Sequence, residues 1–387
     1  MSALLLPTPE GGLESYVPGP ASPYAMTHSG SFPRTVYAAA HVVADPLRLD
    51  DPWRKPAVDW DATLRFRHHL WRLGFKIAEA MDTSQRGLGL DWPAAAELIE
   101  RALAEARTVP GADLACGAGT DQLDPTRPAS LDDVAAAYEE QIAHVEKHGG
   151  RVILMASRAL CRAARGSEDY LSVYGRLIGQ TRDKVILHWL GEAFDPALEG
   201  YWGSSAFEPA MDTVLQLIRS HADKVDGIKI SLLDARKEIA MRRLLPAGVA
   251  MYTGDDFNYA ELMQGDEQGF SHGLLGIFDP IAPAAAAALD LLGAGDTGGF
   301  RAILDPTVAL SRRLFEAPTQ FYKSGVVFLA WLNGFQDHFR MVGGAESARG
   351  IVHYADLFRL ADQAGLLADP DQAAHRMQLL CRINGVG

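Results

Sequence analysis

The stretch VDGIKISLLDARKEIAMRRLLPAGVAMYTGDD, residues 225–256, contains two short apolar runs, VDGIKIS and GVAMYTG, separated by an amphipathic helical segment. Short strands that alternate with helices indicate a parallel sheet, because a crossover is needed before the next strand can run in the same direction. This stretch therefore favours an α/β fold.

The same alternation extends over most of the chain. Six further apolar runs bring the number to eight: TVYAAAHVV, FKIAEAMD, ADLACGAG, RVILMAS, VILHWLG and GFSHGLLG. Helix starts are indicated by Asp91 with Pro93, by Ser130 with Asp133, and by Ser167. Eight such units predict a (β/α)8 TIM barrel, with an open doubly wound sheet as the alternative. No GxGxxG or GxxxxGK[ST] motif supports nucleotide binding.

The barrel pattern divides the chain into three parts. Residues 1–33 are rich in Pro, Gly and Ser and form a predicted N-terminal extension. Residues 34–295 contain the eight runs, and residues 296–387 read as helical to the end. We therefore expect a barrel followed by a C-terminal helical extension.

The composition excludes several classes of function. The 387-residue chain is 48% hydrophobic and carries a net charge of −13, without a basic block that would attract nucleic acid or an anionic membrane. It has no basic leader and no run of ~18 apolar residues, so we expect a cytoplasmic protein. Its three cysteines lack CxxC spacing, and we expect reduced thiols. A small-molecule substrate remains the natural partner.

Lys229 lies between two isoleucines in a predicted buried strand, and it is one of only eight lysines. A buried ammonium without a partner is costly, so its pKa should fall, and the neutral amine could form a Schiff base with a carbonyl. The alternative is a structural ion pair with Asp255 or Glu79. Lys76 serves as a control, because it lies near the start of its strand, at the face associated with stability.

Polar residues near other strand ends allow two kinds of chemistry. His188 and His272 could move protons, or could be hydrogen-bonded core residues. One residue of the Asp255–Asp256 pair is expected to cap the following helix. A mixed His/carboxylate set could instead bind a divalent metal such as Zn or Mn, although no HExxH motif supports it: His41, Glu79, Asp82, His188 and His272.

The elements GIK, TGDD and GFSHG, followed by Pro280, occur in an order and spacing that resembles the dihydrodipicolinate synthase/N-acetylneuraminate lyase superfamily. APTQFYKSGVVFLAWLNG also looks like the helical segment that follows the barrel in that family. The resemblance implies that Lys229 is the Schiff-base lysine and that the protein is a homo-oligomer, a dimer or a tetramer.

Upstream segments match the family less well. MDTSQRG stands where the family has GTTGE, so the resemblance implies that Thr83 and Ser84 hold a substrate oxygen, whereas Asp82 departs from the motif. His188 replaces the tyrosine of a YNxP element. Arg158 falls where the family has its proton-relay tyrosine, and no tyrosine occurs between Tyr138 and Tyr170.

We therefore expect a class I aldolase or lyase that acts through Lys229 on a small keto acid or keto sugar, without a cofactor. His188 and His272 are the expected proton-transfer groups. The expected substrate-binding residues are Asp82, Thr83, Ser84, Arg158 and Asp255. The alternatives are a metal-dependent sugar isomerase, epimerase or hydrolase on the same barrel, and a non-catalytic metabolite-binding barrel.

Overall fold

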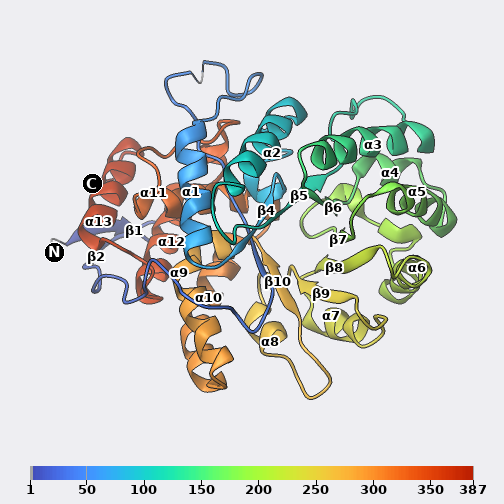
Figure 1. The fold of residues 1–387 in the computed structure, drawn as a ribbon. Coiled ribbons are helices and arrows are strands. Elements are labelled where there is room, and N and C mark those ends of the chain that lie inside the picture. Colours follow the sequence, from blue (N-terminus) through green and yellow to red (C-terminus); the bar gives the residue numbers. More distant parts are fainter. Residues whose placement is uncertain (1–2, 49, 387) are drawn as a thin grey trace. The chain divides into compact units, whose positions relative to one another are not determined.

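The computed structural model describes residues 3–48 and 50–386, and it contains a closed barrel of eight parallel strands in the order β10-β3-β4-β5-β6-β7-β8-β9 (Figure 1). Each predicted run contains one strand: β3 (Val36–Ala39), β4 (Lys76–Glu79), β5 (Leu114–Ala118), β6 (Arg151–Leu154), β7 (Val185–Leu190), β8 (Val225–Ser231), β9 (Ala250–Thr253) and β10 (His272–Leu275). The predicted (β/α)8 fold is confirmed.

Helices and short 3-10 turns follow the strands in the expected alternation, and Figure 1 shows α3 to α7 on the outer side of β5 to β9. They are η1 (Asp82–Ser84), α2 (Trp92–Ala106), α3 (Leu131–Lys147), α4 (Arg158–Ala163), α5 (Ser167–Gln180), η2 (Pro196–Leu198), η3 (Tyr201–Gly203), α6 (Phe207–Ser220), α7 (Ala235–Arg242) and α8 (Tyr259–Gln264).

Two of the predicted helix starts are confirmed by their hydrogen bonds. The Asp91 side chain accepts from the backbone N–H of Ala94 at the start of α2. Ser130 and Asp133 form a reciprocal capping box at the start of α3. These side chains satisfy backbone N–H groups that a helix leaves unpaired at its first turn.

The barrel interior is filled by alternate residues of the strands, as expected when every second side chain of a strand points to the same side. The packed interior consists mainly of Tyr37, Ala39, Ala78, Met81, Ala115, Ile153, Met155, Ile186, Tyr252 and Leu274. This set fixes which face of each strand lines the barrel.

The amino ends of the strands carry an ionic cluster. Lys76 Nζ lies 2.8 Å from Asp113 Oδ2, and Arg151 bonds the same oxygen at 2.8 Å and the Tyr37 hydroxyl at 2.5 Å. Lys76 is the first residue of β4 and is paired, so its predicted place at the stability face of the barrel is confirmed.

The chain separates into two compact units. The barrel unit comprises Arg34–Ala40 and Phe75–Gly276 and contains all eight barrel strands. The terminal unit comprises Met1–Pro33, His41–Gly74 and Ile277–Gly387. Its elements are β1 (Leu4–Pro7), β2 (Leu13–Tyr16), α1 (Trp60–Arg72), α9 (Phe278–Gly293), α10 (Thr297–Leu314), η4 (Thr319–Phe321), α11 (Tyr322–Leu332), η5 (Ala345–Ala348), α12 (Ile351–Gln363) and α13 (Pro370–Ile383).

The C-terminal helices are present as expected, whereas the antiparallel β1–β2 hairpin was not predicted. In the part of the chain that the structure covers, no helix is both long enough and apolar enough to cross a membrane.

Candidate functional site

Lys229 projects into the barrel. Ile186 belongs to the packed interior, so His188, two residues along β7, points to the same side. His188 pairs in register with Lys229 on the neighbouring strand β8, and paired residues of parallel strands share a face. The sixth barrel strand therefore carries its lysine toward the interior.

The environment of Lys229 makes its charged form less favourable than it is in water. The side chain is only 8% exposed, and among residues 3–48 and 50–386 it has no hydrogen-bond or ion-pair partner. Burial lowers the pKa of Lys229, while the carboxylates of Asp256 and Asp82 act in the opposite direction. The amine is thus desolvated, yet two anions lie near enough to act on its charge.

Gly254 lacks a side chain where the Lys229 side chain packs against the backbone. A Cβ atom at this position would lie 2.5 Å from Lys229 Cε and 2.8 Å from the carbonyl oxygen of Ile230, and it would also meet the Ser231 hydroxyl. Any larger residue would have to displace the lysine stem or the strand backbone. The glycine of the TGDD element is therefore a packing requirement of the Lys229 side chain.

His188 is a buried neutral imidazole next to the lysine. Burial, followed by the charge of Lys229, holds the pKa of His188 well below its usual value. Its Nε2 lies 3.3 Å from the Ser231 hydroxyl, and its Nδ1 has no hydrogen-bond partner among the residues that the structure describes. An imidazole in this state can accept a proton without first losing one.

The segment after β4 brings Asp82 close enough to influence the charge of Lys229. Thr83 and Ser84 are buried beside it in η1. The Ser84 hydroxyl donates to the Met81 carbonyl oxygen at 2.6 Å, so its proton already has an acceptor. As a donor to a substrate, Ser84 would have to give up that bond.

The two adjacent acids after β9 have different surroundings. Asp255 Oδ1 accepts from the backbone N–H groups of Phe257 and Asn258, and Oδ2 accepts from the Asn258 side chain at 2.7 Å. Asp256 is buried and acts electrostatically on Lys229. Asp255 was the expected substrate ligand, but its neighbour Asp256 is the acid beside the amine.

Arg158 lies at the start of α4 and is half exposed, with its guanidinium paired to Asp195. Arg158 was expected to bind substrate, either by pairing with a carboxylate or by polarising a carbonyl, and its observed partner is a carboxylate of the chain itself. The preceding residue, Ser157, is buried instead, and its hydroxyl lies 2.6 Å from that of Thr120, two residues after β5. This hydroxyl pair was not predicted.

Two tyrosine hydroxyls lie close to the backbone of Ser157, although the sequence around Ser157 contains no tyrosine. Tyr201 accepts a hydrogen bond from the backbone N–H of Ser157 at 3.0 Å, and its hydroxyl lies 2.7 Å from that of Tyr174. Burial raises the pKa of both tyrosines well above the usual value. These phenols are neutral groups that position the β6 end.

Two expected site residues lie elsewhere in the barrel unit. His272 is the first residue of β10 rather than the last, and its Nδ1 accepts from the backbone N–H of Thr35 at 3.0 Å. Glu79 follows the inward-facing Ala78, so it points to the opposite side of β4. Glu79 is the last residue of β4, as expected, but it faces away from the interior. The expectation that His272 stands at the end of its strand is corrected, because the boundaries of that strand were unknown from the sequence.

His41 belongs to the terminal unit, where its Nδ1 lies 2.8 Å from Asp279 Oδ2 in a fully buried pair. Within the described ranges, no three His, Cys, Asp or Glu side chains are arranged to hold a metal ion. Of the alternative metal set, His41 lies in the terminal unit, and the other members, Glu79, Asp82, His188 and His272, lie in the barrel unit.

Solved structures of dihydrodipicolinate synthases share this fold. The enzyme from Aquifex aeolicus is 14% identical, with a TM-score of 0.65 and coverage of 86% of this chain and 99% of that chain. A putative dihydrodipicolinate synthetase from Pseudomonas aeruginosa is 15% identical, with the same TM-score and coverage. The 4-hydroxy-tetrahydrodipicolinate synthase from Methylacidiphilum fumariolicum SolV is 14% identical, with a TM-score of 0.64 and coverage of 90% and 99%.

No curated protein matches the chain. One family model does, and it spans residues 4–386. The predicted resemblance is thus confirmed at the level of the fold, and by its sequence the chain belongs to the family described as "Protein of unknown function (DUF993)".

Proposed function

We propose that the protein is a class I aldolase or lyase in which Lys229 forms a Schiff base with a small keto acid or keto sugar. The observation that carries the proposal is the buried Lys229 amine on the sixth barrel strand, inward-facing and without a hydrogen-bond partner among the described residues. A structural ion pair, the alternative for such a lysine, would require a carboxylate within bonding distance.

The surroundings of Lys229 suit both the neutral amine that attacks the substrate and the cationic iminium that follows. Burial favours the neutral amine, which adds to the substrate carbonyl, and loss of water then gives an iminium. The iminium is cationic at any pH near neutrality, so the negative charges of Asp82 and Asp256 stabilise it. The same two carboxylates that oppose the neutral amine therefore favour the intermediate.

His188 is the best-placed proton carrier. Cleavage of the carbon–carbon bond sends its electron pair into the iminium nitrogen to give an enamine, and a proton must leave the substrate hydroxyl on the other fragment. A neutral imidazole one strand away, with an unpartnered buried Nδ1, can take that proton and later return it to the enamine carbon. Thr83 and Ser84 would bind a substrate oxygen.

The substrate class rests on the chemistry of the amine and on one neighbour. The iminium acts as an electron sink only for bonds next to the original carbonyl, which limits substrates to keto compounds or their aldol products. A structural neighbour from Acinetobacter baumannii was solved in complex with pyruvate. Pyruvate is therefore the first probe, followed by longer 2-oxo acids and keto sugars.

The test is reductive trapping. The protein is incubated with each probe and sodium cyanoborohydride, and the modified peptide is located by mass spectrometry. We expect one adduct on Lys229, with the mass of the probe less one oxygen atom because water leaves before the reduction, and no adduct at that peptide in Lys229→Met.

Lys76→Met provides the matched control, because it removes a lysine from the opposite end of the barrel and should leave the adduct in place. Modification spread over surface lysines, or a substrate that is turned over without any adduct, would refute the imine mechanism. Loss of turnover on chelation, in the absence of trapping, would identify the metal-dependent alternative.

A further inference from the structure

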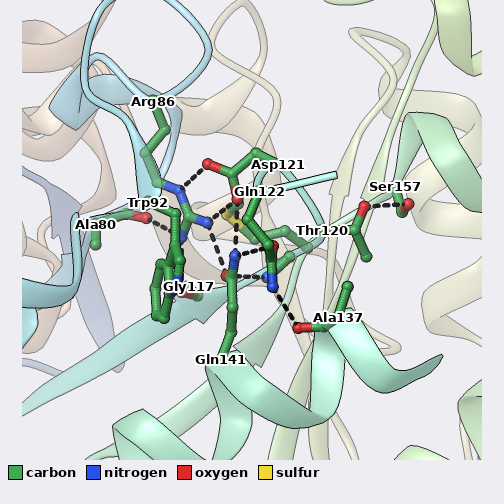
Figure 2. A network of polar contacts seen from close by, with 12 residues as sticks. Ala80, Arg86, Trp92, Gly117, Thr120, Asp121, Gln122, Ala137, Gln141 and Ser157 are labelled. Atoms are coloured by element: carbon green, nitrogen blue, oxygen red, sulfur yellow. Dashed lines mark hydrogen bonds and ion pairs between the residues drawn. The ribbon is translucent and has the colours of Figure 1, made fainter. Parts of the chain in front are cut away.

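Arg86 is buried, 3% exposed, in the segment after β4 that also carries Asp82. Its Nη1 donates to the carbonyl oxygens of Ala80 at 3.1 Å and Gly117 at 2.9 Å. Its Nε and Nη2 donate to the two carboxylate oxygens of Asp121. A fifth bond, from Nη2 to Gln141 Oε1 at 2.8 Å, completes the five that a guanidinium can make (Figure 2).

The partners of Arg86 are themselves held in place. Figure 2 shows Gln141 of α3 beneath the guanidinium, with its Nε2 donating to Asp121 at 2.9 Å and to Gln122 at 2.7 Å. Gln141 Oε1 also accepts from the backbone N–H of Gly119 at 2.7 Å. The network therefore ties the segment after β4 to the segment after β5 through fixed groups.

The backbone that Arg86 holds is strained. Ala80 and Gln85, on either side of η1, have φ angles of 52° and 69°, a region that residues other than glycine rarely adopt. Such conformations are costly and persist where surrounding contacts over-determine them. Arg86 binds the carbonyl of one strained residue and directly follows the other, so it clamps both ends of the turn that presents Asp82.

We propose that Arg86 is a positioning residue, which holds the strained turn Ala80–Gln85 so that the Asp82 carboxylate stays beside Lys229. The inference rests on the proposed function for its catalytic meaning, since Asp82 there stabilises the iminium. The positioning itself can be measured without any substrate. Arg86 does not touch the reacting atoms.

The experiment measures the titration of Lys229 directly. The full-length protein is labelled with a trace of acetic anhydride across a pH series, and the rate at each lysine peptide is read by mass spectrometry. Arg86→Lys keeps the positive charge but loses the planar fork that engages Asp121 and two carbonyls. We expect the pH midpoint of the Lys229 titration to fall by about 0.5–1 pH unit, because a displaced Asp82 carboxylate stabilises the ammonium less.

A double variant separates positioning from general damage. If Arg86 acts through Asp82, then Asp82→Asn alone lowers the Lys229 midpoint, and adding Arg86→Lys lowers it no further. The midpoint of Lys76, at the opposite barrel end, should not move in any variant. If Arg86→Lys fails to fold, Asp121→Asn replaces it and should cause a smaller shift in the same direction.

An unchanged Lys229 midpoint in the folded Arg86 or Asp121 variant would overturn the inference, as would an equal shift with and without Asp82. The outcome is independent of reductive trapping. A shifted midpoint in a protein that traps no keto compound would retain Arg86 as the positioning residue and reject the imine mechanism. Trapping on Lys229 together with an unmoved midpoint would support the imine mechanism and reject Arg86 as the positioning residue.

Discussion

Replacement of Glu238 by Gln should raise the free energy of unfolding, relative to the parent protein, progressively as pH increases. Glu238 lies on α7 and is fully buried, with Oε1 accepting from the Ser271 hydroxyl at 2.6 Å. Its Oε2 has no hydrogen-bond partner in the described part of the chain. Burial raises the pKa of this carboxyl from 4.5 to about 8, so it is mainly protonated at neutral pH.

The magnitude follows from proton linkage. Between pH 4.5 and 8 the unfolded chain releases the Glu238 proton while the folded protein retains it, so this group lowers the free energy of unfolding as pH rises. Each pH unit in that interval costs about 1.4 kcal/mol, or about 4–5 kcal/mol over the whole interval. A glutamine at this position does not titrate, so the free energy of unfolding of the variant would not fall for this reason.

The assay is urea unfolding of parent and Glu238→Gln at pH 5, 6, 7 and 8, followed by tryptophan fluorescence. The difference in free energy of unfolding should rise with pH at a slope near 1.4 kcal/mol per unit, whatever its value at pH 5. Glu261→Gln, an exposed acid on α8, controls for the loss of one surface charge. A difference that is constant or falls with pH would refute the reasoning.

Three further substitutions test the surroundings of Lys229 and Ser157. Gly254→Ala should abolish the Lys229 adduct in cyanoborohydride trapping and destabilise the fold by about 1–3 kcal/mol in urea, because its Cβ would lie 2.5 Å from Lys229 Cε. Asp256→Asn removes a charge that supports the ammonium, so the acetic anhydride midpoint of Lys229 should shift to lower pH by about half a unit or more. Tyr201→Phe leaves the buried N–H of Ser157 without its acceptor and should cost about 1–3 kcal/mol, measured by urea unfolding.

The barrel could be predicted from the sequence because its strands are buried on both faces and read as continuous apolar runs. The N-terminal hairpin gave no such signal. In β1 the sequence LLLP ends in proline, and in β2 the sequence LESY is mostly exposed, so neither shows the alternation expected of a half-buried strand. Residues 1–33 were therefore described only by their composition, and the hairpin within them was not predicted.

The position of Lys229 was predictable, whereas its partners were only partly so. A lysine within an apolar strand stands out in a single sequence, but the sequence does not say which of two adjacent acids acts on its charge. Asp255 forms the local capping bonds that its type favours at a turn, which leaves Asp256 beside the amine. His272 was misplaced for a related reason: the strand GFSHGLLG begins at the histidine instead of ending there.

The missing relay tyrosine now has a structural counterpart with different chemistry. Tyr174 and Tyr201 reach the β6 end from α5 and η3, but their raised pKa values make proton release unfavourable. Their hydroxyls bond to each other and to the backbone of Ser157, which fixes the strand end without supplying an acid or base. If Lys229 forms an imine, the proton exchange must pass to a group with a vacant lone pair near neutral pH. His188, one strand away from the lysine, is the candidate, because it is neutral and its Nδ1 is unpartnered among the described residues. Its lowered pKa makes it a weaker base than an ordinary histidine, and makes its protonated form a stronger acid toward the enamine carbon.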